Sequence, residues 1–288
     1  MATAPLASTG SLEIVDTELS ADTLTPVSAA LRLGDRLAFL LESVEGGVRY
    51  GRHSLVGVRG RTLTVRGEIA ELRDAGGALL GSWSAADPLE ALRSVLPNAP
   101  AHERLPVPIA SGVGYLAYEV AARWERLPVP DLDPIGLPDA VFHLPAALIV
   151  FDHLDQVALL ATLAERDGHA SAEARLADVT RRLAEPVAAE RPAAVPARGS
   201  GRIGPDAEAG DGAEFERGVA SLVGQIREGE MLQAVLARRF SLPGSHDPFA
   251  VYRALRRINP SPYLFHVELG PAGAGAGRQA LVGASPEL

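Results

Sequence analysis

The stretch Gly229-Glu-Met-Leu-Gln-Ala-Val-Leu-Ala-Arg-Arg-Phe240 is predicted to be a buried strand, and the interpretation of the chain starts from it. Alternate residues of a strand point to opposite faces, and both faces of this run are mainly apolar, which is typical of a strand covered on two sides. Gln233 places an uncharged amide among them. A buried amide needs partners, because leaving it without hydrogen bonds costs about 1–3 kcal/mol. Two interpretations stay open: a core residue satisfied by backbone, which physics alone favours, or an amide that points into a polar site.

The composition is that of a globular protein. The chain has 288 residues, 47% hydrophobic and 22% charged, enough for one large domain or two smaller ones. Its formal charge of -9 argues against nucleic acid or anionic membrane as a partner. The absence of Cys excludes disulfides and thiolate chemistry, and the absence of Lys excludes Schiff-base catalysis. No apolar run is long enough to span a bilayer and no signal pattern opens the chain, so a cytoplasmic location is expected.

Apolar periodicity divides the chain into four parts. Residues 1–11 are small and polar and are expected to be a disordered tail. Residues 12–184 alternate strand-like and helical patterns and are expected to form a first lobe. Residues 185–212 are rich in Pro, Ala, Gly and charge, which is typical of a linker. Residues 213–288 show a helix, the strand quoted above, a second helix and two more strands, so we predict a mixed α+β fold.

Few local motifs indicate chemistry by themselves. The run Gly273-Ala-Gly-Ala-Gly277 lacks the Lys-Ser/Thr ending of a phosphate-binding loop, and a strand pattern follows it, so a hairpin loop is favoured. The seven His residues form no helical metal-binding pair, and no nucleophile elbow is present. The prolines of Asn259-Pro-Ser-Pro-Tyr-Leu264 hold the chain rigidly, either as a helix stop before a core tyrosine or as the wall of a pocket.

Five motifs, in order along the chain, resemble those of the large, chorismate-binding subunit of anthranilate synthase. They are Leu40-Leu-Glu-Ser-Val-Glu-Gly-Gly47 with Tyr50-Gly-Arg-His-Ser54, Gly112-Val-Gly-Tyr-Leu-Ala-Tyr-Glu119 with Glu125-Arg-Leu-Pro128, Gly229–Leu236, Arg256-Arg-Ile-Asn-Pro-Ser-Pro-Tyr263, and Gly283-Ala-Ser-Pro-Glu287. The resemblance covers nearly the whole chain outside the tail and the linker. It implies a two-lobed α+β fold with β-sheets packed between helices. Residues 12–184 would form a tryptophan-regulatory lobe, and residues 213–288 would form an incomplete chorismate-binding domain.

The same resemblance implies a reaction and its partners. The family adds ammonia to chorismate at the second ring carbon and then eliminates pyruvate, which leaves anthranilate, in the first committed step towards tryptophan. A glutamine amidotransferase subunit delivers the ammonia, Mg2+ binds the chorismate carboxylate, and L-tryptophan inhibits from a separate site.

Carried over residue by residue, the resemblance implies two groups of site residues. The tryptophan-binding residues are Glu42, Ser43, Pro262, Tyr263 and Leu264. The catalytic residues are Gln233 and Glu287. Gln233 takes the position of a general-base lysine in related enzymes that add water, and ammonia, already a nucleophile, needs no such base. A neutral Glu287 carboxyl could protonate the ring hydroxyl that leaves first.

The motifs that supply the Mg2+ ligands, a catalytic histidine and the chorismate carboxylate cradle would follow Leu288. We therefore expect no metal ligands in this chain and little activity from it alone. Three alternatives stay open. Aminodeoxychorismate synthase shares Gln233 and the Ser-Pro-Glu motif but resembles the first two motifs less closely. Salicylate and isochorismate synthases are disfavoured by Gln233. A tryptophan-binding module without catalysis is the third.

Overall fold

The computed structural model describes residues 12–43, 51–128, 133, 135–187, 212–241, 246–271 and 278–285. The chain divides into two compact units, one of residues 1–189 with 247–288 and the other of residues 190–246. Each unit is described here by itself.

This division differs from the boundary expected between residues 12–184 and 213–288. The last part of the second segment belongs to the first unit, because a strand near the C-terminus pairs with one from the first part of the chain. The expected tail and most of the expected linker, residues 1–11 and 188–211, lie outside the described residues.

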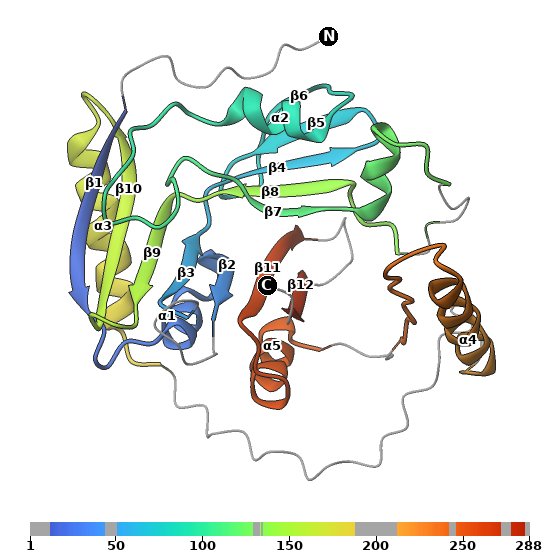
Figure 1. Ribbon diagram of the computed structural model, residues 1–288. Coiled ribbons are helices and arrows are strands. Elements are labelled where there is room, and N and C mark those ends of the chain that lie inside the picture. The colour runs from blue at the N-terminus through green and yellow to red at the C-terminus, as the bar shows by residue number, and fades with distance from the viewer. Residues whose placement is uncertain are drawn as a thin grey trace. The chain divides into compact units, whose positions relative to one another are not determined.

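A seven-stranded antiparallel sheet, with strand order β1-β10-β9-β3-β2-β11-β12, forms the centre of the first unit (Figure 1). The strands are β1 (Leu12–Ser20), β2 (Leu37–Glu42), β3 (His53–Val58), β9 (Ala147–Asp152), β10 (Val157–Glu165), β11 (Tyr263–Pro271) and β12 (Arg278–Ser285). The two strands expected after the second helix of residues 213–288 are confirmed as β11 and β12. The pairing of β2 with β11 joins segments that are far apart in the sequence.

A second antiparallel sheet has the order β6-β5-β4-β8-β7. Its strands are β4 (Arg61–Arg66), β5 (Ile69–Arg73), β6 (Leu79–Ser84), β7 (Val113–Leu116) and β8 (Ala140–Leu144). Helix α2 (Pro88–Val95) packs its buried Ala91 and Val95 against this sheet. The helix begins at Pro88, because the Asp87 side chain accepts the Leu89 N–H at 2.7 Å and Pro88 takes the first helical position.

Three helices pack on the seven-stranded sheet through one shared apolar core: α1 (Pro26–Leu33), α3 (His169–Ala184) and α5 (Pro248–Ile258). A second apolar cluster joins Phe39, Val150 and Val267 of the sheet to Ile109, with Val113 of β7 packed against it. Two short 3-10 helices, η1 (Gly34–Arg36) and η2 (Tyr118–Arg123), complete the first unit's described helices. Within the described part of the chain, no helix is both long and apolar enough to cross a membrane.

The predicted buried strand at 229–240 is wrong. Helix α4 (Gly212–Glu228) forms as expected and ends at Gly229, which takes φ 84°. Residues 231–239 then adopt neither helix nor strand, and Leu232 and Val235 are 99% and 85% exposed. The alternating apolar pattern meets the local requirement for a strand, but burial also needs neighbours on both edges and cover on both faces. The described residues supply neither to this segment.

Candidate functional site

Antiparallel pairing of β2 with β11 brings the two expected tryptophan-binding motifs together. Leu264 lies opposite Glu42, and Phe265 lies opposite Leu41. Strand β2 contributes Leu and Phe side chains and β11 contributes Leu, Phe and Val, and their burial between helices and the second apolar cluster stabilises the pairing. Sheet register, not sequence proximity, therefore places the start of one motif beside the end of the other.

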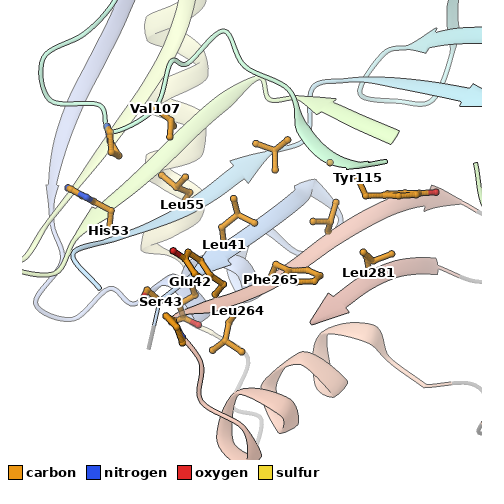
Figure 2. Close-up of a pocket in the computed structure, with 16 residues that line it drawn as sticks. Leu41, Glu42, Ser43, His53, Leu55, Val107, Tyr115, Leu264, Phe265 and Leu281 are labelled. Atoms are coloured by element: carbon orange, nitrogen blue, oxygen red, sulfur yellow. The ribbon is translucent and has the colours of Figure 1, made fainter. Parts of the chain in front are cut away.

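A cavity of about 500 Å3 opens at this junction (Figure 2), and we call it the β2–β11 pocket. All five residues expected to bind tryptophan line it: Glu42, Ser43, Pro262, Tyr263 and Leu264. The walls are otherwise mainly apolar, from Leu41, Leu55, Val107, Val113, Phe265 and Leu281. A pocket of this size, with apolar walls and a few polar groups, suits a ligand with an aromatic body and a polar end.

Strand β7 closes the far wall with Val113, Gly114 and Tyr115. A Cβ at Gly114 would overlap the Val141 carbonyl of β8, so glycine allows the close approach of the two strands. The Tyr115 hydroxyl donates to the Pro138 carbonyl at 2.7 Å, and burial raises the pKa of Tyr115 to about 12. The motif that contains Gly112–Glu119 therefore contributes a wall of the same pocket.

Ser43 carries an unsatisfied group at the pocket. Its Oγ is buried and has no hydrogen-bond partner among the described residues. Such an atom costs free energy unless a ligand or ordered water satisfies it. Ser43 therefore brings unused hydrogen-bonding capacity to the pocket, as far as the described residues show.

Glu42 lines the pocket, yet its carboxylate is already engaged by helix α5. Oε2 accepts the Tyr252 hydroxyl and the Arg256 Nε–H, both at 2.7 Å, and Oε1 accepts the Arg256 Nη2–H at 2.9 Å. Tyr252 and Arg256 lie one helical turn apart, so both reach the same carboxylate. The Glu42 side chain thus holds α5 against the end of β2, beside the pocket.

The pKa shifts of Tyr252 and Arg256 agree with their hydrogen bonds to Glu42. Burial, followed by the negative charge of Glu42, raises the pKa of Tyr252, which therefore stays a neutral hydrogen-bond donor. The hydrogen bond to Glu42 raises the pKa of Arg256 above its ordinary value. The Glu42 side chain is only 3% exposed, so this pair is well shielded from water on its acidic side.

His53 stands at the edge of the pocket (Figure 2). Its Nε2 lies 3.5 Å from Asp152 Oδ2, which also accepts from Arg52 Nη2 at 2.6 Å. The hydrogen bond from Arg52 is the main cause that lowers the pKa of Asp152 to about 2. These contacts fix the start of β3 to the end of β9 beside the pocket.

Of the two expected catalytic residues, only Gln233 lies among the described residues. Gln233 is exposed in the irregular segment after α4, so its amide is not buried as the strand prediction required. Glu287, with Pro286 and Leu288, lies outside the described residues. No group of three or more His, Asp or Glu residues in the described ranges could hold a metal ion, so no residue here is assigned to Mg2+.

Sequence reasoning missed the partners of Glu42. Arg256 stands in the quoted motif that ends at Tyr263, and Tyr252 precedes it by four residues. That spacing indicates two donors on one helix face, but only the tertiary structure identifies the acceptor as Glu42.

Comparison with known proteins gives concordant results. A family model described as chorismate binding enzyme matches residues 39–288. Anthranilate synthase component 1 of Thermus thermophilus is 39% identical over 278 residues, which cover 93% of this chain and 54% of that protein. The Streptomyces coelicolor protein of the same name is 37% identical, with 93% and 49% covered. The chain spans about half the length of these curated relatives.

The fold has a solved counterpart. The crystal structure of anthranilate synthase component I from Streptococcus pneumoniae TIGR4 aligns with a TM-score of 0.58 and 25% sequence identity. The alignment covers 93% of this chain and 57% of that one. The two antiparallel sheets and their helices therefore match part of a known two-lobed architecture.

Proposed function

Because the chain belongs to the family of chorismate-binding enzymes, we propose that it functions in the large subunit of an anthranilate synthase. The proposed reaction converts chorismate and ammonia into anthranilate, pyruvate and water. Relatives named anthranilate synthase component 1 that align with 93% of the chain support this assignment over aminodeoxychorismate synthase. The amide of Gln233, at a position where water-using relatives need a base, supports ammonia as the nucleophile.

We further propose that the β2–β11 pocket binds L-tryptophan as a feedback inhibitor. One observation carries this proposal: five residues from two distant motifs line one cavity. The indole ring would occupy the apolar part between Leu41, Leu55 and Phe265. The hydroxyl of Ser43, which has no partner among the described residues, would accept from the ammonium group or donate to the carboxylate of the amino acid.

Calorimetric titration of the 288-residue chain with L-tryptophan tests the pocket. Saturable binding with one site is expected, and L-alanine is the control, because it carries the same polar end without the indole. Equal binding of both amino acids, or no heat from a folded chain, would reject the assignment of the pocket to tryptophan.

The reaction is tested separately. Purified chain is incubated with chorismate, ammonium and Mg2+, and anthranilate is followed by its fluorescence. We expect far less product than from an intact large subunit, and we expect glutamine to replace ammonium only when an amidotransferase subunit is added. A second candidate function is a tryptophan-binding regulatory module without catalysis. It is supported by a pocket lined by described residues, while Gln233 is exposed. Tryptophan binding without anthranilate formation, both with ammonium and with glutamine plus an amidotransferase subunit, would favour this candidate.

A further inference from the structure

A second cavity, of about 290 Å3, shares no lining residue with the β2–β11 pocket. It lies where Arg61, the first residue of β4, meets the segment that follows α2 and the face of α3 that carries Arg175. We call it the Arg61 cavity. Leu96, Pro97 and Ile109 give it apolar walls.

Arg61 places a positive charge in this cavity without a counter-charge. Its guanidinium has no hydrogen-bond or ion-pair partner among the described residues. Burial lowers the pKa of Arg61, and no carboxylate in the described part of the chain acts in the opposite direction. A half-buried arginine normally pairs with an acid, because a guanidinium loses hydration when it leaves water.

Arg175 of α3 adds a second guanidinium to the same cavity. Its Nη1 donates to the Thr162 hydroxyl at 2.7 Å and to the Leu163 carbonyl at 3.3 Å. These bonds fix the position of the side chain, and among the described residues they engage only one of its three nitrogen atoms.

No acidic side chain lines the Arg61 cavity within the described residues. Ala75 lines it, but the neighbouring Asp74 turns into its own hairpin, where Oδ1 accepts the N–H groups of Gly76 and Ala78, both at 2.9 Å. The hydroxyl of Ser111 is a further polar group on the wall. The cavity thus presents positive donors and one hydroxyl, with apolar surfaces between them.

We propose that the Arg61 cavity binds a small organic anion, whose carboxylate or phosphate lies between Arg61 and Arg175 and whose apolar part contacts Leu96 and Ile109. Planar guanidinium groups suit both kinds of oxyanion, because their parallel N–H bonds match two oxygen atoms. An anion would also replace part of the hydration that the Arg61 guanidinium loses on burial. The site is independent of the proposed function, since it uses no residue of the β2–β11 pocket.

Calorimetry and thermal unfolding of the 288-residue chain test this site. Benzoate and inorganic phosphate are titrated separately at constant ionic strength, with chloride as the control anion. Either probe is expected to bind with one site and, at about ten times its Kd, to raise Tm by about 3 °C. Tighter binding of benzoate would identify a carboxylate with an apolar body, and tighter binding of phosphate would identify a phosphate group.

Arg61→Met is expected to weaken the binding of the preferred anion at least about tenfold. The matched control is Arg166→Met, which removes the same charge from an exposed position outside the cavity and leaves binding unchanged. Arg61→Lys keeps the charge but not the planar fork, so it is expected to bind with intermediate affinity. Circular dichroism checks that each variant is folded.

Two results would overturn the proposal. One is an equal response to chloride and to both probes in the unmodified chain. The other is unchanged binding in Arg61→Met, which would place the anion elsewhere, including an aromatic carboxylate in the β2–β11 pocket. A chain that fails to bind tryptophan could still bind an anion in the Arg61 cavity. The proposal for the β2–β11 pocket and the proposal for the Arg61 cavity can therefore fail separately.

Discussion

Ser43 lines the β2–β11 pocket, and its buried hydroxyl oxygen has no hydrogen-bond partner among the described residues. We predict that Ser43→Ala lowers the affinity for L-tryptophan about tenfold, because a hydrogen bond to a charged group is lost. The free chain should gain about 1 kcal/mol of unfolding free energy, since an unsatisfied polar atom is removed. Calorimetric titration and urea unfolding measure the two effects.

A lower tryptophan affinity together with a higher unfolding free energy in Ser43→Ala would show that Ser43 binds the ligand and does not stabilise the fold. Ser171→Ala is the control, because Ser171 lies exposed on α3, away from the pocket. If Ser43→Ala weakened binding and stability together, the hydroxyl would be part of the fold and the ligand contact would have to lie elsewhere.

The pairing of Glu42 with Arg256 leads to a second prediction at this scale. Arg256→Met leaves a nearly buried carboxylate with Tyr252 as its remaining partner among the described contacts. We expect a loss of about 2 kcal/mol in unfolding free energy, less than for a fully buried pair, because the Arg256 side chain is 36% exposed. Tryptophan affinity should fall as well, since the end of β2 loses its support from α5.

A double-mutant cycle with Glu42→Gln measures this coupling. The two changes together should cost less than the sum of the separate costs, because each one removes the same interaction. Arg257→Met serves as the control on the exposed side of α5. Strict additivity would mean that the pair does not stabilise the chain.

At the scale of elements, the close packing of β2 against β3 depends on a phenylalanine ring that lies over a glycine. Phe39 pairs with Gly57, and a Cβ on Gly57 would overlap the Phe39 ring. The ring is fully buried and has no free space to move into. We predict that Gly57→Ala lowers the unfolding free energy by about 1–3 kcal/mol, as measured by denaturant unfolding.

Gly224→Ala makes the same chemical change in the interior of α4, where a Cβ would meet nothing within 4 Å. Alanine favours a helix by about 1 kcal/mol over glycine, so this variant should not be destabilised. A tolerated Gly57→Ala would show that β2 and β3 adjust their spacing, which would also change the shape of the pocket wall at Leu41 and Leu55.

At the scale of the molecule, His143 connects the two sheets of the first unit. It is fully buried on β8, and its Nε2 bonds the Glu268 carbonyl of β11. A carbonyl only accepts, so Nε2 carries the proton, and Nδ1 accepts from the Thr62 hydroxyl at 3.2 Å. Burial lowers the pKa of His143 to about 4, so the ring is neutral in the folded chain.

This neutrality predicts a pH dependence of stability. The unfolded chain takes up a proton on His143 near its ordinary pKa of about 6.5, whereas the folded chain does so only near 4. The unfolding free energy should therefore fall as pH decreases from about 6.5 to 4. Urea unfolding across this window should show a smaller slope for His143→Gln, and the exposed His169→Gln should retain the original slope. Equal slopes in all three chains would contradict the prediction.

Much of the local structure could be predicted from single segments. The hairpin of β9 and β10, the caps at Asp87 and Asp247, and helix α4 follow from periodicity and capping chemistry. The segment 229–240 shows the limit of this reasoning. Its alternation is correct for a strand, but strand formation depends on partners that the local sequence does not contain.

The sequence by itself determined the order of helices and strands in most of the chain and the absence of cysteine and lysine chemistry. Its resemblance to a known family named the five residues that line the β2–β11 pocket. Only the tertiary structure decided the engagement of the Glu42 carboxylate by Tyr252 and Arg256 and the joining of residues 247–288 to the first unit. It also decided that no acidic side chain of the described residues lines the cavity at Arg61. The physical reason is the distance along the chain over which each interaction acts. Periodicity and capping act within one or two turns or strands, whereas register, burial and charge pairing depend on segments that meet only in the folded chain.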